Sequence, residues 1–271
     1  GHVSLSLSFP HFTLLSQTCC LVAPDARGHG LTVCDDPADM SVETLTEDTI
    51  LLVSKCIVGP TRTALSFYTC ACDPPQIQAL LAEGGPLGCS QDVPMLLVGH
   101  SLGGGTAVRV AGSGRLPNVK GVAVIDMVEG TALASLESLP EVMQAIPQEF
   151  DTMEDAIEWH VRSRAIRSNA SAKVTVPSRM KVAEDGKVRY SWVTWRTNLL
   201  QQQQHWEGWF LGLSEMFLAL PQPKLLIVAG MDRLDTPLTM GQIQGKFQLK
   251  LVYSAGHSIH GDYLWQPACQ A

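Results

Sequence analysis

Short apolar runs of strand length recur along this chain and alternate with stretches of helical periodicity. The apolar runs lie at 19–24, 95–98, 121–125, 224–230 and 247–252. Most of them are apolar at nearly every position, which is typical of strands in a parallel sheet whose two faces are both covered. Between the first two runs, Val42, Leu45, Leu52 and Val53 fit one face of a helix over 41–55. The pattern predicts one α/β domain over residues 1–271.

Three segments depart from this alternation. Residues 3–9 alternate between apolar residues and serine, which predicts a further strand. Residues 56–92 show no sustained period, so we interpret them as an atypical insert at the surface with a short helix at 77–82. Residues 140–220 are predicted to form a helical lid, because 152–155 resembles a capping box and five of the six tryptophans lie in this region. No closing helix is expected at the end of the chain.

Composition narrows the classes of function. The net charge of −7 argues against nucleic-acid binding, which needs clustered lysine and arginine. No run of 18 apolar residues occurs, so no membrane span is expected, and the first residues lack the basic start of a signal peptide. The eight cysteines show no C-x-x-C spacing, which favours free thiols over a metal site or disulfides. We therefore expect a cytoplasmic or nuclear protein that is not secreted and holds no metal or cofactor.

The strongest chemical pattern in the chain surrounds Ser101. The apolar run at 95–98 leads into Gly99-His100-Ser101-Leu102-Gly103, and more small residues follow. A strand, a sharp turn that carries a serine, and a helix form a nucleophile elbow. The strained turn requires residues without bulk two positions before and after the serine, and Gly99 and Gly103 meet this requirement. The positive N-terminus of the helix that follows favours a developing oxyanion.

The other members of a catalytic triad are expected later in the chain, in the order serine, acid, histidine. His257 follows the last strand and a glycine, which is the usual place for the base, whereas His260 is the weaker candidate. The spacing of the residues does not identify which aspartate is the acid. Asp126 ends one predicted strand, and Asp232 and Asp235 follow the next.

Several longer runs resemble the protein phosphatase methylesterase family, a branch of the α/β hydrolases. These runs are Gly99–Gly104, Ile125–Ala132, Ala156–Trp159, Trp206–Ser214, Pro223–Asp235 and Gly241–Gln248. The resemblance implies an α/β-hydrolase fold, a mostly parallel sheet with helices on both faces and a lid. It also implies the triad Ser101, Asp126 and His257, with the backbone N–H of Leu102 as an oxyanion donor. The activity implied is removal of the methyl ester from the C-terminal leucine of the type 2A protein phosphatase catalytic subunit, with docking around that partner's active site.

The chain departs from this family at three places. The family's His-Gly-Gly-Gly-His oxyanion loop is represented only by Gly1-His2, and residues 56–92 and the tail after Asp262 have no clear counterpart. The resemblance therefore implies a fold that is incomplete at both ends, with no strand between those at 19–24 and 95–98. A small-molecule esterase of the same fold and a non-catalytic phosphatase-binding protein are the alternative functions.

Overall fold

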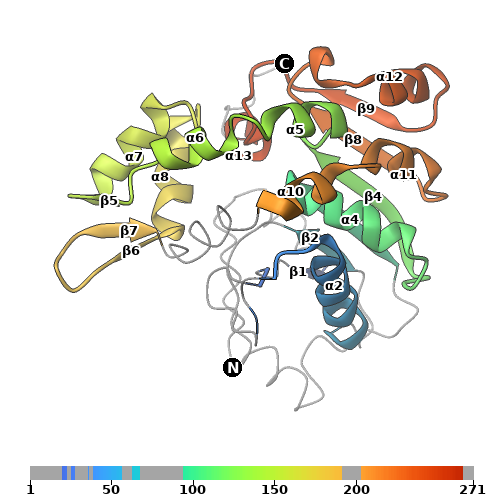
Figure 1. The fold of residues 1–271 in the computed structure, drawn as a ribbon, viewed down its shortest axis with the longest axis horizontal. Coiled ribbons are helices and arrows are strands. Elements are labelled where there is room, and N and C mark those ends of the chain that lie inside the picture. Colours follow the sequence, from blue (N-terminus) through green and yellow to red (C-terminus); the bar gives the residue numbers. More distant parts are fainter. Residues whose placement is uncertain are drawn as a thin grey trace.

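The core of the molecule is a six-stranded sheet in which every neighbouring pair is parallel. The computed structural model describes residues 20–22, 26–27, 36, 39–56, 63–67, 94–190 and 203–264. Within them the strand order is β1-β2-β3-β4-β8-β9 (Figure 1). The strands are β1 (Cys20–Val22), β2 (Thr63–Phe67), β3 (Met95–His100), β4 (Val119–Ile125), β8 (Lys224–Val228) and β9 (Gln248–Leu251).

Successive side chains of the central strands divide between the two faces of the sheet, as the pleat requires. On β3, Leu97 belongs to the main hydrophobic core and the next residue, Val98, packs against a smaller cluster. The same alternation separates Leu226 from Ile227 on β8. Both faces are therefore covered, which explains why these strands are apolar at consecutive positions.

The larger face carries four helices that pack on one another and on the sheet. They are α2 (Val42–Cys56), α4 (Leu102–Gly112), α10 (Gln203–Phe210) and α11 (Leu213–Ala219). The short helix α13 (Ile259–Leu264) contributes Ile259 to the cluster on the opposite face. The helices α5 (Glu129–Ser135) and α12 (Thr236–Ile243) and the 3₁₀ turn η1 (Met231–Arg233) follow the ends of β4 and β8.

The segment that was expected to form a lid, called the lid below, has a small core of its own, although Met143 on its first helix lies in the main core. It contains α6 (Leu139–Ala145), β5 (Glu149–Phe150), α7 (Met153–Arg162), α8 (Asn169–Ser178), β6 (Met180–Val182) and β7 (Val188–Tyr190). These elements gather at one side of the molecule, away from α2 and α11 (Figure 1). Phe150, Ala156 and Val176 are among the buried residues of its core. The expected capping box is confirmed, because the side chains and backbone N–H groups of Thr152 and Asp155 bond reciprocally at the start of α7.

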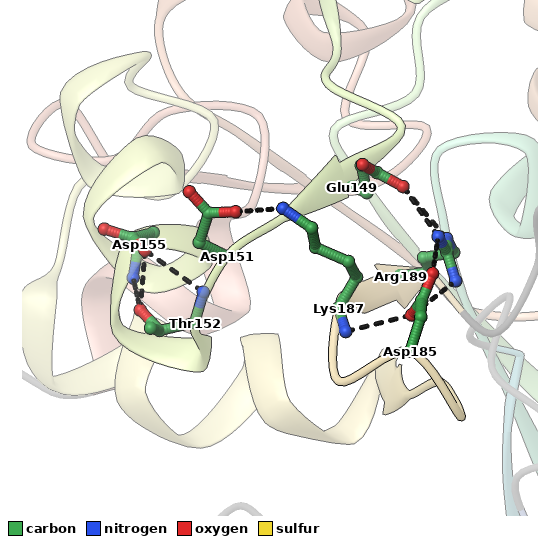
Figure 2. A network of polar contacts seen from close by, with 7 residues as sticks. All are labelled: Glu149, Asp151, Thr152, Asp155, Asp185, Lys187 and Arg189. Carbon is green, nitrogen blue, oxygen red and sulfur yellow. Dashed lines mark hydrogen bonds and ion pairs between the residues drawn. The ribbon is translucent and has the colours of Figure 1, made fainter.

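Charged side chains connect the strands of the lid at its surface (Figure 2). Arg189 on β7 bridges Glu149 and Asp185, with N–O distances of 2.8 and 2.6 Å. Lys187, just before β7, pairs with Asp151, just after β5. Exposed ion pairs of this kind contribute about 0–1 kcal/mol each, so the network supports strand register and marks no site.

The lid differs from the expected helical segment at 140–220 in two respects. It includes a three-stranded antiparallel sheet in the order β5-β7-β6. In addition, Trp206 and Trp209 on α10 lie in the main core, where the indole N–H of Trp209 donates to the backbone oxygen of Met40 at 2.7 Å. Because α10 packs in the main core, the lid ends before this helix. The chain also forms a helix after its last strand, α13, which the sequence did not predict.

The largest correction concerns residues 56–92, which we expected to be a surface insert beside a gap in the sheet. Part of this segment is β2, which pairs in parallel with β1 on one side and with β3 on the other. The position that the family resemblance left empty is therefore filled from within the atypical segment. The strand expected at 3–9 and the helix expected at 77–82 lie outside the described residues.

Because β2 is central, a residue without a backbone N–H should disrupt it. Leu65 has Cα partners on both sides, Val22 and Leu97. We expect Leu65→Pro to lose one ladder hydrogen bond and to lower the free energy of unfolding by at least about 1–3 kcal/mol. Leu65→Ala, which keeps the N–H, is the control in urea unfolding. Equal losses for both variants would show that β2 is not held by the sheet.

Candidate active site

Ser101 occupies a strained turn between β3 and α4. Its backbone has φ 53° and ψ −127°, a conformation that residues with a Cβ rarely adopt. A Cβ at Gly99 would lie 2.2 Å from the backbone oxygen of Gly103, so the turn closes only because residue 99 has no side chain. The N–H of Ser101 donates to the oxygen of Ile125 at 3.0 Å, which fixes the turn to β4. These contacts fit the nucleophile elbow that the sequence predicts.

Three side chains from distant parts of the chain form a continuous hydrogen-bonded row. Ser101 Oγ lies 3.0 Å from His257 Nε2, and His257 Nδ1 lies 2.8 Å from Asp126 Oδ2. With Asp126 ionised, the ring proton lies on Nδ1, so Nε2 is free to accept the proton of the serine hydroxyl. The His257 side chain is 54 % exposed, whereas that of Asp126 is 3 % exposed. The reactive end of the row faces solvent and its acidic end is buried.

Asp126 follows the last residue of β4 with φ 46°, a left-handed conformation that aspartate tolerates better than most residues. Its Oδ1 accepts from the N–H of Ala229 at 3.3 Å, and Arg233 approaches its Oδ2 to 3.8 Å. Burial alone would raise the pKa of Asp126, but the hydrogen bond and charge of His257, with Arg233 and Ala229, lower it below its ordinary value. The carboxylate is therefore ionised at neutral pH.

The other acids and the other histidine that the sequence left open have different surroundings. Asp235 Oδ1 caps α12 by accepting from the N–H of Leu238 at 3.0 Å, and its Oδ2 accepts from Ser214 Oγ at 2.6 Å. Asp232 is exposed on η1. His260 is buried on α13, where its ring contacts that of His100. Of the three acids, the structure brings Asp126 to His257.

His100, which immediately precedes the serine, is a site residue that the sequence analysis missed. Its Nε2 lies 2.8 Å from the backbone oxygen of His257, and its ring lies 4.7 Å from the rings of both His257 and His260. Burial, with His260 and His257 nearby, holds the pKa of His100 well below its ordinary value of 6.5. His100 is therefore neutral, and the proton on its Nε2 donates to the loop that carries His257.

Glu129 is a second residue whose role the sequence did not reveal. Its carboxylate accepts from the N–H groups of Gly212 and Ser214 at 2.8 and 2.9 Å. It thereby caps α11 from the segment that begins at Asp126. Residues 125–132 thus contain both Asp126, which contacts His257, and Glu129, which holds the start of α11.

The candidate oxyanion donor, Leu102, is the first residue of α4. The N–H groups in the first turn of a helix have no intrahelical partner and point along the positive end of the helix dipole. The backbone of Leu102 is therefore available to a developing negative charge beside Ser101. Gly1-His2, which the family resemblance links to the second donor, lies outside the described residues.

Among the residues that the structure describes, no group of three histidine, cysteine or acidic side chains is arranged to hold a metal ion. None of the described helices is both long and apolar enough to cross a bilayer. The chemistry that this arrangement supports is attack by a serine hydroxyl on a carbonyl, assisted by a histidine that a carboxylate orients.

Comparison with known proteins narrows this chemistry to one family. Residues 1–267 match the model of the alpha/beta hydrolase family. Human protein phosphatase methylesterase 1 is 33% identical over 300 residues, which cover 97% of this chain and 70% of the human protein. The chain belongs to the protein phosphatase methylesterase family. Its Schizosaccharomyces pombe relative is 37% identical, with 97% of this chain and 68% of that protein covered, and its Gibberella zeae relative is 40% identical, with 91% and 55% covered.

Solved structures confirm the fold of this methylesterase-family chain. E-2-(acetamidomethylene)succinate hydrolase matches with a TM-score of 0.59 at 16% identity, covering 91% of this chain and 87% of that one. An esterase of M. tuberculosis matches with a TM-score of 0.56 at 18% identity, covering 89% and 71%. At such low identity the likeness extends to the fold alone. The predicted α/β-hydrolase architecture, with its parallel sheet and helices on both faces, is confirmed.

The geometry distinguishes Asp126 from Asp232 as the orienting acid. We expect Asp126→Asn to slow labelling of Ser101 by a fluorophosphonate on the order of 10⁴-fold, because an amide no longer holds the imidazole in the required tautomer. Asp232→Asn is the matched control, since Asp232 is an exposed acid on the neighbouring η1. Comparable slowing by the two variants would contradict the assignment.

The buried histidines predict a loss of stability in acid. Burial, with Arg179 and His257 nearby, lowers the pKa of His260 to about 3, and the pKa of His100 is also depressed. Below pH 6.5 the unfolded chain therefore binds more protons than the folded one, and stability decreases as the pH falls. Each histidine adds a slope of up to about 1.4 kcal/mol per pH unit. His260→Gln should remove one such contribution from the pH dependence of urea unfolding, with His205→Gln as the control for a histidine outside this cluster.

Proposed function

We propose that this chain is a serine carboxylesterase that removes the methyl ester from the C-terminal leucine of the type 2A protein phosphatase catalytic subunit. The observation that carries the proposal is the row from Ser101 through His257 to Asp126, with contacts of 3.0 and 2.8 Å. The relatives named protein phosphatase methylesterase 1 support a phosphatase methyl ester as the substrate. This chemistry requires only side chains and a backbone donor.

The first half of the reaction forms an acyl-enzyme. Ser101 Oγ attacks the ester carbonyl while His257 Nε2 accepts the hydroxyl proton, and Asp126 stabilises the resulting imidazolium. The carbonyl oxygen becomes an oxyanion, which the N–H of Leu102 at the start of α4 would receive. Collapse of this intermediate breaks the bond to the methoxy group, which takes the proton from His257 and leaves as methanol. The leucine carbonyl then remains attached to Ser101.

The second half repeats these roles with water. His257 removes a proton from water, the hydroxide attacks the acyl carbonyl, and the bond to Ser101 Oγ breaks as the serine regains its proton. The products are a free C-terminal carboxylate and the original enzyme. The half-exposed ring of His257 leaves the base accessible to water for this step.

We further propose that the partner is the catalytic subunit of the phosphatase and that this chain docks around the active site of that subunit. A cytoplasmic or nuclear location suits such a partner, and eight cysteines without C-x-x-C spacing suit a reducing compartment. The net charge of −7 gives no support to a nucleic-acid partner.

The test is incubation of the methylated phosphatase with this chain, followed by mass spectrometry of the phosphatase C-terminus. We expect the wild-type chain to remove the methyl group and Ser101→Ala to remove none, because the variant has no nucleophile. Ser135→Ala, at the end of α5, is the matched control and should act as the wild type does.

Two outcomes would contradict this function and identify an alternative. Hydrolysis of short aryl esters without action on the phosphatase would indicate a small-molecule esterase. Co-purification with the phosphatase without fluorophosphonate labelling of Ser101 would indicate a non-catalytic binding protein.

A further inference from the structure

One buried carboxylate connects the lid to the loop that carries His257. Asp262 lies on α13 and is 5% exposed. Its Oδ2 accepts from the backbone N–H of Gly256 at 2.9 Å. Its Oδ1 accepts from the N–H groups of Arg167 and Ser168 at 2.7 and 3.2 Å. Three backbone donors from two segments thus converge on a single side chain.

The two segments that Asp262 joins have different positions in the molecule. Gly256 directly precedes His257 on the loop after β9. Ser168 is the N-cap of α8 in the lid, where its hydroxyl accepts from the N–H of Ser171. The carboxylate therefore lies between the lid and the base, at the positive end of a lid helix.

The contact between these segments leaves no room for additional side chains. A Cβ at Gly256 would lie 3.1 Å from Arg167 Nε and 3.3 Å from Asp262 Oδ2. A Cβ at Gly261 on α13 would lie 2.7 Å from Ser171 Oγ on α8. The backbone of the His257 loop is thus packed directly against the lid, and a displacement of one would displace the other.

An ionised carboxylate suits this position better than its amide. Both oxygens of Asp262 accept hydrogen bonds, and those bonds are strengthened by the negative charge. In asparagine one of the two oxygens becomes an NH₂ group, which would face a backbone N–H and leave a buried donor unpaired. Substitution by asparagine should therefore release one of the two segments while keeping the size of the side chain.

The position of His257 depends on such contacts because its ring is half exposed and gains little from packing. The backbone on one side of it is held by Asp262 through Gly256, and its own oxygen is held by His100. We propose that Asp262 is a positioning residue, which sets His257 against Ser101 and couples that position to helix α8 of the lid. This inference rests on the proposed function, in which His257 is the base.

The experiment compares Asp262→Asn with Asp155→Asn. Asp155 also caps a lid helix, α7, where its carboxylate accepts from the N–H and the hydroxyl of Thr152 at 3.1 and 2.7 Å. We expect Asp262→Asn to slow fluorophosphonate labelling of Ser101 on the order of 10²-fold, as a small misplacement of a catalytic group does, and Asp155→Asn to leave the rate unchanged. The full-length chain is used throughout.

A second measurement reports the geometry without requiring activity. In the wild type, the Nδ1 proton of His257 should give a downfield NMR signal because it bonds to Asp126, and His257→Ala identifies that signal by its loss. We expect Asp262→Asn to shift or broaden it and Asp155→Asn to retain it. If the wild-type chain shows the His257 signal but Ser101 is not labelled, the proposed function is rejected. The effect of Asp262→Asn on the signal then still tests the positioning role.

Two results would overturn the inference. One is a folded Asp262→Asn variant that labels at the wild-type rate and keeps the wild-type signal of His257. If Asp262→Asn does not fold, Gly256→Ala is used in its place. The added methyl group separates the same loop from the lid, and the carboxylate of Asp262 is kept. A wild-type labelling rate and signal in Gly256→Ala would then show that the base does not depend on this contact.

Discussion

The left-handed backbone of Ser101 is the constraint on which the rest of the structure depends. A non-glycine residue in such a conformation costs about 1–3 kcal/mol and persists only where its surroundings enforce it. Here the position of β3, which ends directly before Ser101, is fixed because parallel strands pair with it on both sides. The close approach of Gly99 to Gly103 and the bond from Ser101 N to Ile125 O complete the enforcement. The presence of β2 therefore matters to the site, since without it β3 would have an unpaired edge directly before Ser101.

Carboxylates that accept backbone N–H groups attach the segments around the site to one another. Glu129 holds the start of α11, and Asp262 holds both the lid and the His257 loop. Such bonds are partly buried, charge-assisted and directional, so each fixes the position of a segment. The exposed ion pairs of the lid sheet contribute much less, because water and salt screen them (Figure 2). The elements around the site are thus positioned by acids that have backbone partners.

Local sequence patterns predicted the elements that are defined by consecutive residues. They did not predict features that depend on residues far apart in the chain or on a segment without periodicity. The elbow at Ser101 was predictable, because the strand, the glycines and the helix start are consecutive. The strand β2 was not, since Thr63–Phe67 mixes polar and apolar residues and lies in a segment without periodicity. Spacing could not choose the acid, because that choice depends on which strand end meets His257 across 131 residues. Asp262 was missed for a related reason, as its partners Arg167 and Ser168 lie 95 and 94 residues away.

The histidines near His257 show how burial controls charge beside the proposed base. When His257 accepts a proton it becomes a cation. A positive charge on His100, whose ring lies 4.7 Å from that of His257, would oppose that step, and so would one on His260, whose ring lies 4.7 Å from that of His100. Burial keeps the pKa of both residues low, so they remain neutral where His257 must change its charge. Neutral His100 can still donate its Nε2 proton to the oxygen of His257. The same burial that makes the fold sensitive to acid therefore keeps His100 and His260 from adding positive charge beside the imidazolium that the proposed mechanism forms at His257.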